Sequence, residues 1–194
     1  MQKIAPTLLL LFSMAISTAA ARTAIELDLT NQRAYLIKGG EIVTSAPIAS
    51  GRASHPTPTG TYRVTQKSRD HRSSLYGMVI DSSGRVVKAD ADHETPVPRG
   101  GKFLRAPMRY FLRFNGAVGM HAGILPGYPA SHGCVRLPSS RAALFYRHAQ
   151  IGTPVRVYGR APYRGTSVTS SKYSGTKRRT APLYRRIPYM FQIF

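Results

Sequence analysis

The chain has 194 residues but only one cysteine, Cys134. A single thiol excludes a disulfide framework within the chain, on which many small secreted domains depend. Four interpretations of Cys134 remain: an inert buried thiol, a metal ligand, a partner for another chain, or a nucleophile. The residues around it, "HAGILPGYPASHGC" at 121–134, decide among them below.

Long apolar runs are also scarce. The first stretch, "MQKIAPTLLLLFSMAISTAAA", has Lys3, an apolar segment at 8–16 and three alanines at 19–21, the pattern of a secretory signal. It is short for a membrane span, which takes about 20 apolar residues. We expect a signal peptide over 1–21, removed before Arg22. An uncleaved N-terminal anchor is the alternative. No second apolar run follows, so we expect export to the periplasm or cell envelope.

Acidic residues are few. The chain has 8 Asp and Glu against 28 Lys and Arg, a net charge of +20, and no acid follows Glu94. Without Lys3 and the rest of 1–21 the charge is 27 − 8 = +19. Such a field attracts polyanions. Because an exported protein rarely meets nucleic acid, we expect no nucleic-acid partner and instead an anionic cell-wall or membrane surface.

Short strands dominate the middle of the chain, 22–159. Alternating apolar residues predict strands over 24–48, "TYRVTQK", "GMVI", "MRYFLRF", "AVGMHA" and "TPVRVYG". Hairpin turns are predicted at Lys38-Gly39-Gly40 and Asn115-Gly116, and loops at 68–76 and 88–101. One helix is predicted at about 139–149, after Pro138. This pattern favours a mostly-β barrel or sandwich with one or two short helices.

From Arg160 the composition changes to Ser, Thr, Gly, Tyr and Arg without a clear period. We expect 160–194 to be a basic, disordered C-terminal tail that holds the protein on an anionic surface.

The chemistry of the cysteine stretch favours a nucleophile. A thiol reacts as thiolate, and a histidine is the usual proton acceptor. Two histidines are near, and we predict His121 as the general base because a strand can aim it, while His132 shapes the site. With no acid after residue 94, a backbone carbonyl is the expected orienting acceptor of His121. The amides of Gly133 and Cys134 can face an oxyanion.

These residues resemble a known family. "SHGCVRLP" at 131–138, with "GMHAG" upstream, is similar to the active-site signature of L,D-transpeptidases with a YkuD-type catalytic domain. "SGRASHPTPTGTYRV" at 50–64 resembles the family's stretch ahead of the site. The resemblance covers about 24–159 and implies a β-sandwich-like catalytic domain acting through a cysteine thioester. The short gap between His121 and Ser131 implies a small lid.

The resemblance implies a cofactor-free enzyme that acts on peptidoglycan stem peptides and forms 3→3 cross-links. It implies catalytic roles for Cys134, His121, Gly133 and His132, and substrate contacts for Arg136 and Ser131. With water as acceptor the same scaffold is a carboxypeptidase or endopeptidase, and with a lipoprotein lysine it is an anchoring enzyme.

Two other classes remain as alternatives. A zinc site would use His121, His132 and Cys134 as ligands. A non-catalytic cell-wall binder would use charge alone. We expect Tyr110 to line the cleft, and His55, His71 and His93 to be solvated loop residues.

Overall fold

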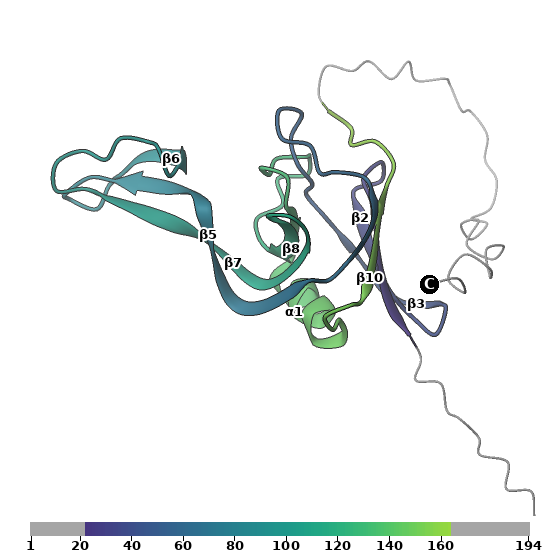
Figure 1. Cartoon of the computed structure of the whole chain (residues 1–194). Coiled ribbons are helices and arrows are strands. Elements are labelled where there is room, and N and C mark those ends of the chain that lie inside the picture. The colour runs from purple at the N-terminus through teal and green to yellow at the C-terminus, as the bar shows by residue number, and fades with distance from the viewer. Residues whose placement is uncertain (1–21, 164–194) are drawn as a thin grey trace, which may run out of the picture.

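A computed structural model describes residues 22–163, so the predicted signal peptide and most of the predicted tail lie outside the described residues. These residues form ten strands and one helix in two five-stranded sheets (Figure 1). The first sheet has the order β3-β2-β1-β10-β4. Its strands are β1 (Thr23–Asp28), β2 (Arg33–Lys38), β3 (Glu41–Pro47), β4 (Gly60–Arg63) and β10 (Pro154–Tyr158).

The second sheet has the order β6-β5-β7-β8-β9. Its strands are β5 (Gln66–Ile80), β6 (Val86–Asp92), β7 (Lys102–Asn115), β8 (Val118–Ala122) and β9 (Val135–Leu137). The helix α1 (Ser139–His148) follows β9 directly and begins after Pro138. β8 and β9 pair in parallel, while β7 pairs antiparallel with both β5 and β8.

One apolar cluster joins the two sheets and the helix. The first sheet buries alternate residues of β1 and β10, the second sheet buries those of β7, β8 and β9, and α1 adds its inner face. The members with the largest side chains from these elements are Ile25, Leu27, Val155, Val157, Leu112, Phe114, Met120, Leu137 and Phe145. Full burial of such a side chain contributes about 1.5–3 kcal/mol, so this cluster fixes the position of β8 and β9.

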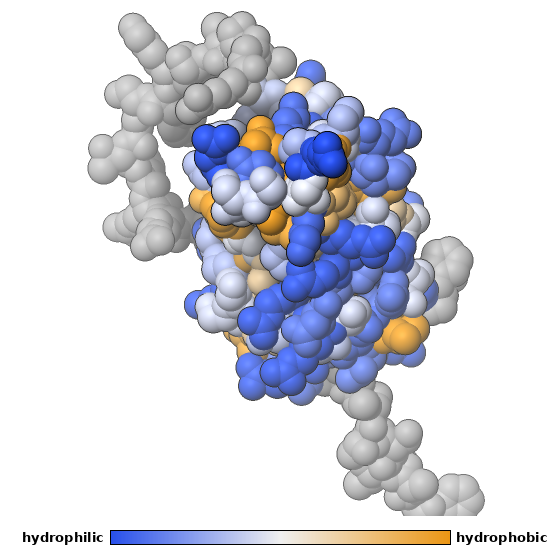
Figure 2. Space-filling model, turned by 90° about the vertical axis from the view of Figure 1, so that its left-hand side faces the viewer, coloured by the Kyte–Doolittle hydropathy of each residue, from blue (hydrophilic) through white to orange (hydrophobic). Residues whose placement is uncertain are grey.

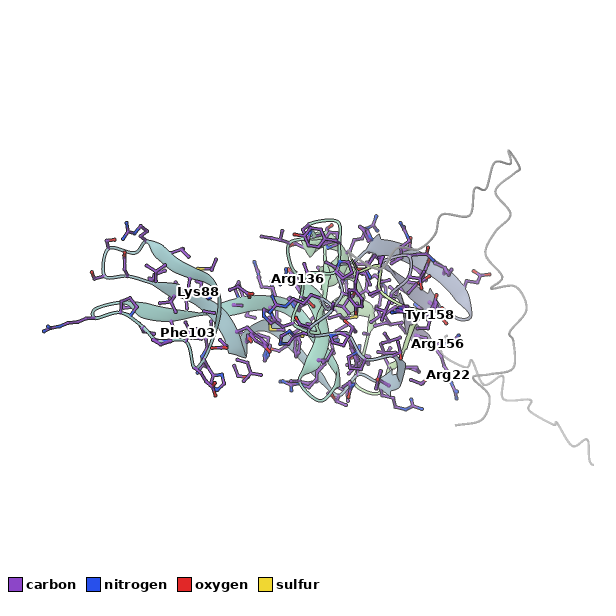
Figure 3. All side chains as sticks on the ribbon, turned by 90° about the horizontal axis from the view of Figure 1, so that it is seen from above. Arg22, Lys88, Phe103, Arg136, Arg156 and Tyr158 are labelled. Atoms are coloured by element: carbon purple, nitrogen blue, oxygen red, sulfur yellow. The ribbon has the colours of Figure 1, made fainter. Side chains whose placement is uncertain are left out.

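The far half of β5, all of β6 and the first half of β7 extend away from this core, and we call residues 76–105 the arm (Figures 1 and 3). The β5–β7 register shifts between Arg72 and Gly77, where the arm begins. In Figure 3, Lys88 and Phe103 of the arm lie at the opposite end of the molecule from Arg156 and Tyr158 of β10.

Seen from the side of the arm, the surface is mostly hydrophilic, with apolar patches mainly in the upper half of the view and a separate one at the lower right (Figure 2). The large apolar side chains that the arm and its turns expose are Val86, Val87, Val97 and Leu104.

Most sequence-based predictions of elements are confirmed. Strands fill 24–48 with a turn at Gly39-Gly40, β7 and β8 flank Asn115-Gly116, and the helix spans 139–148. The predicted loops at 68–76 and 88–101 are wrong, since β5 runs through the first and β6 covers part of the second. Both are polar segments without alternation, held as strands by backbone pairing with their neighbours.

The apolar cluster continues past the end of β10 at Tyr158. Ala161 is 5% exposed and belongs to the apolar cluster, and the Arg160 amide donates to Thr30 Oγ1 at 3.0 Å. Within residues 22–163, no helix has the length and apolar character needed to cross a membrane.

Candidate active site

The β8–β9 pair places the predicted nucleophile and base on one face of the second sheet. The parallel register sets His121 opposite Arg136, and Cys134 lies immediately before β9. Since residues two apart in a strand share a face, Cys134 and Arg136 lie on the same face as His121. The intervening residues Met120 and Val135 point into the core instead.

His121 is held in one tautomer by its own strand. It is 7% exposed, and its Nδ1 lies 2.8 Å from the carbonyl oxygen of Ala122. A carbonyl only accepts, so Nδ1 carries the proton and Nε2 is the basic nitrogen of the neutral ring. Burial lowers the pKa of His121 to about 4, against the opposing effect of the Ala122 carbonyl and with a further repulsion from Arg136.

Cys134 is a neutral thiol at rest. Burial raises its pKa above the ordinary range, although the backbone amide of Gly119 and the charges of Arg113 and Arg136 act in the opposite direction. Its Sγ lies 3.9 Å from the carbonyl oxygen of Ala117, a weak hydrogen bond. Burial thus disfavours both charged forms, the thiolate and the imidazolium of His121. The resting pair is thiol and imidazole, so the proton has to move as the sulfur attacks.

The loop before Cys134 is fixed by internal hydrogen bonds. Gly133 has φ +106°, in the region that favours glycine, and its amide donates to Ser131 Oγ at 3.2 Å. The Ser131 hydroxyl donates to the Cys134 carbonyl, and the Gly133 carbonyl accepts from Thr57 Oγ1 at 2.7 Å. Because the Gly133 amide has a partner in the loop, the Cys134 amide is the better-placed oxyanion donor of the predicted pair.

The structure also places the other two predicted substrate contacts, Ser131 and Tyr110. Ser131 is 2% exposed, and its hydroxyl braces the loop by donating to the Cys134 carbonyl. Tyr110, at φ +59°, packs against the core and lies 5.9 Å from the ring of Tyr146 on α1. Its side chain is therefore on the core side of β7.

His132 is directed toward the arm. Its ring stacks on Tyr76 at 4.0 Å and meets His55 edge-on at 5.0 Å. Its Nε2 lies 2.6 Å from Arg52 Nη2 and 3.3 Å from Asp90 Oδ1. A guanidinium only donates, so Nε2 accepts and His132 is neutral in this arrangement. Burial lowers its pKa, against the attraction of Asp90.

A cavity of about 270 Å³ separates the arm from the body at this point. The cavity is lined by the end of β6 and the turn after it, residues 90–94, together with Arg52, His55, Leu75, Tyr76 and His132. The arm therefore forms one wall of this cavity.

Three histidines that we expected to be solvated belong to the site region. His55 and His93 line the cavity, and His71 stacks on Phe111 at 4.3 Å, next to His121. In the sequence, only the position of His55 just before the Thr-Pro-Thr-Gly stretch could have indicated a place near the site. His71 could not be placed, because the pairing of β5, which carries it, was not predicted. Among residues 22–163, the structure brings together no group of three His, Cys, Asp or Glu side chains that could hold a metal ion.

Comparisons with known proteins agree with this arrangement. The model of the YkuD L,D-transpeptidase catalytic domain matches residues 22–157. L,D-transpeptidase 2 of Mycobacterium tuberculosis is 33% identical over 121 residues, 61% of this chain and 26% of the relative. L,D-transpeptidase 1 of the same species is 24% identical over 63% of this chain and 45% of the relative. The chain thus spans between a quarter and a half of the length of these curated relatives.

Solved structures share the fold. An L,D-transpeptidase from Mycobacterium smegmatis has a TM-score of 0.54 and 21% identity, over 72% of this chain and 59% of its own. A mutant L,D-transpeptidase from Enterococcus faecium has a TM-score of 0.52 and 26% identity, over 72% and 50%. Another L,D-transpeptidase, with a TM-score of 0.53 and 22% identity over 71% and 59%, was solved in complex with imipenem.

The family model covers most of the chain, from the first strand to the last, and includes both the thiol loop and the strand that carries His121. On this match the chain belongs to the family of YkuD L,D-transpeptidase catalytic domains.

Proposed function

We propose that this protein is an exported acyltransferase that transfers peptidoglycan stem peptides through a thioester on Cys134. The observation that carries the proposal is the placement of Cys134 and His121 on one face of β8–β9, with His121 Nε2 left basic by the Ala122 carbonyl. Family membership supports the substrate class, since the matching family model is that of an L,D-transpeptidase catalytic domain.

In the first half-reaction, Cys134 Sγ attacks the carbonyl carbon between an L-centre and a D-centre of the donor stem. The thiol proton passes to His121 Nε2, and the C–S bond forms. The carbonyl oxygen, now an oxyanion, is stabilised by the Cys134 amide. When the tetrahedral intermediate collapses, the C–N bond breaks and the His121 proton goes to the leaving amine, which departs as D-alanine.

In the second half-reaction, an amine in its neutral form attacks the thioester carbonyl. The C–N bond forms, the C–S bond breaks, and the proton lost by the amine passes through His121 to the departing sulfur. When the amine belongs to a second stem peptide, the product is a 3→3 cross-link. Water in the same place gives a hydrolase, and a lipoprotein lysine gives an anchored protein.

The test of this proposal is product analysis. Purified disaccharide-tetrapeptide is incubated with residues 22–194, and the products are identified by mass spectrometry. A dimer that has lost one D-alanine supports transpeptidation, and a tripeptide alone shows a hydrolase. Cys134→Ala is the control. A carbapenem such as imipenem should add its mass to the wild type and not to the variant, whereas an adduct on the variant would exclude Cys134 as the nucleophile.

We also propose that the basic C-terminal segment attracts the protein to an anionic surface of the envelope. Residues after 163 include seven basic side chains and no acid: Arg164, Lys172, Lys177, Arg178, Arg179, Arg185 and Arg186. Attraction of this kind weakens with salt, because the Debye length is about 8 Å at physiological ionic strength. Deletion of 164–194 should reduce co-sedimentation with cell-wall sacculi at low salt. Equal, salt-independent sedimentation of the two proteins would exclude this role.

A further inference from the structure

Arg113, which no sequence motif singled out, lies on the face of the second sheet that carries the thiol. In the β7–β8 register Arg113 lies opposite Gly119, while the neighbouring pair, Leu112 and Met120, is buried in the core. Successive residues of a strand point to opposite faces. Arg113 and Gly119 therefore lie on the other face of the sheet, together with His121.

A glycine separates Arg113 from the thiol. Met120 pairs with Val135 in the β8–β9 register, so Gly119 lies beside Cys134, and its backbone amide faces the sulfur. Gly119 has no side chain to shield one group from the other. Burial raises the pKa of the Cys134 thiol, and the charge of Arg113 opposes this effect. The guanidinium of Arg113 is thus within electrostatic reach of the reacting sulfur.

The guanidinium and the sulfur also meet the same turn, the one between β7 and β8. Arg113 Nη1 donates to the carbonyl oxygen of Gly116 at 3.0 Å. Cys134 Sγ lies 3.9 Å from the carbonyl oxygen of Ala117, the next residue of the turn. Two consecutive carbonyls therefore hold the cation and the nucleophile close to each other.

The charge of Arg113 is held by neutral groups. Its Nε donates to Gln66 Oε1 at 2.8 Å, and its guanidinium carbon lies 5.5 Å from the centre of the Phe111 ring, which faces His121 at 6.4 Å. Among residues 22–163, no Asp or Glu forms an ion pair with Arg113. These contacts fix the direction of the guanidinium and leave its charge uncompensated, which suits it to bind an anion.

The other two arginines near the thiol loop are placed differently. Arg52 is paired with Asp90 at 2.8 Å. The side chain of Arg136 packs against Gly123, where an added β-carbon would lie 3.0 Å from its Cδ. Gly123 follows β8, whereas the turn that holds Arg113 precedes it. Arg113 is therefore the cation at the end of β8 that Cys134 Sγ contacts.

The donor of the proposed reaction carries an anion close to its scissile bond. D-Alanine is the last residue of the donor, so its carboxylate lies about 3.5 Å, the span of one residue, from the carbonyl carbon that Cys134 attacks. A cation that binds this carboxylate has to lie beside the thiol. Arginine suits the task, because its planar fork can donate two parallel hydrogen bonds to one carboxylate.

We propose that Arg113 is a substrate-binding residue that holds the terminal carboxylate of the donor stem peptide. The inference rests on the proposed acyl transfer and assigns the group that orients its donor. With the carboxylate on Arg113, the scissile carbonyl is held over Cys134 Sγ, and the leaving amine is held where His121 can protonate it.

The experiment compares two donors. One is disaccharide-tetrapeptide with its free terminal carboxylate, and the other is the same compound with that carboxylate converted to an amide, which removes the charge and keeps the scissile bond. The consumption of each donor by residues 22–194 gives kcat and KM. For the wild type, KM should be about ten- to a hundred-fold higher for the amide, the range for loss of a hydrogen bond to a charged group.

Arg113→Gln should raise KM for the free acid to the value for the amide, and Arg113→Lys, which keeps the charge but not the fork, should retain part of the preference. The matched control is Arg63→Gln on β4. Arg63 Nη1 donates to the Gly152 carbonyl at 3.0 Å, a contact like that of Arg113 with Gly116, but on the first sheet. This control should keep the wild-type preference.

The ratio of the two KM values separates carboxylate binding from an effect on the sulfur or on the fold, because those effects change both donors equally. If Arg113→Gln slows both donors and keeps the wild-type preference, or if the wild type has the same KM for both, the carboxylate site is wrong. If Arg113→Gln fails to fold by far-UV circular dichroism, Arg113→Lys decides, and an undiminished preference in it overturns the proposal. A wild type that consumes neither donor would instead contradict the proposed acyl transfer.

Discussion

Thr57 Oγ1 donates a 2.7 Å hydrogen bond to the carbonyl oxygen of Gly133, 76 residues further along the chain. The same hydroxyl accepts from the Gly51 amide at 2.8 Å, and all three groups are buried. One side chain of the Thr-Pro-Thr-Gly stretch therefore fixes the loop that carries Cys134. This contact explains why two stretches distant in sequence have to be present together.

Thr57→Val should impair both stability and activity. Valine keeps the volume but leaves the Gly51 amide and the Gly133 carbonyl buried without this partner, at a cost of about 1–3 kcal/mol for each unsatisfied group. We expect a lower denaturation midpoint and slower acylation by imipenem, followed by intact-mass spectrometry.

The control for this prediction is Thr59→Val, two residues later on an exposed position of the same stretch. It should change neither measurement. Equal losses in both variants would show that the stretch tolerates no valine for reasons unrelated to the Gly133 contact.

The strands that bury one face could be predicted from the sequence, because burial of one face places apolar residues at every second position. β1, with Ile25 and Leu27, and β10, with Val155 and Val157, are of this kind. The middle of β5, "RDHRSSLYG", has no such alternation of apolar and polar residues. Its backbone pairs with β7 while its side chains are mostly polar and partly exposed, so tertiary pairing overrides local propensity there.

Some residues of the site could likewise be predicted from the sequence, and others could not. His121, Cys134 and a carbonyl acceptor could be predicted, because they lie within the "GMHAG" and "SHGCVRLP" stretches and follow from local chemistry. Asp90, Tyr76 and the cavity could not, because they reach His132 only through the arm. The arm depends on the β5–β7 register, which no local pattern in the sequence reveals.

Gly133→Ala should slow acylation more than it destabilises the fold. At φ +106° a β-carbon is strained by about 1–3 kcal/mol, although its nearest new neighbour, Val118, would lie at an ordinary 3.7 Å. The loop would relieve the strain by moving the Cys134 amide. Gly84→Ala is the matched control, at φ +83° in an open turn of the arm with no atom within 4 Å. Similar loss of imipenem acylation in both would contradict a specific role for the Gly133 backbone.

His121→Ala should reduce D-alanine release by about 10²- to 10⁴-fold, the range for loss of a general base. His132→Ala should cost less in this step, since its ring faces Tyr76 and Arg52. His148→Ala, on α1, should resemble the wild type. If the His132 variant is the slowest of the three in single-turnover measurements, the base has been assigned to the wrong histidine.

The pH dependence should separate a neutral thiol–imidazole pair from an ion pair. His121 accepts a proton only when neutral, and burial lowers its pKa to about 4. The rate of D-alanine release should therefore fall on the acid side with a midpoint near pH 4, below the value of about 6.5 for a solvated histidine.

Because burial raises the pKa of Cys134, alkylation by iodoacetamide, which reports the thiolate, should rise only in alkaline solution. A thiolate–imidazolium pair would contradict both predictions. Alkylation would already be fast at neutral pH, and the acid-side midpoint of D-alanine release would equal the lowered pKa of the thiol. Release and alkylation are measured on the same preparation from pH 3.5 to 10, with far-UV circular dichroism at each pH to exclude unfolding as the cause of the acid loss.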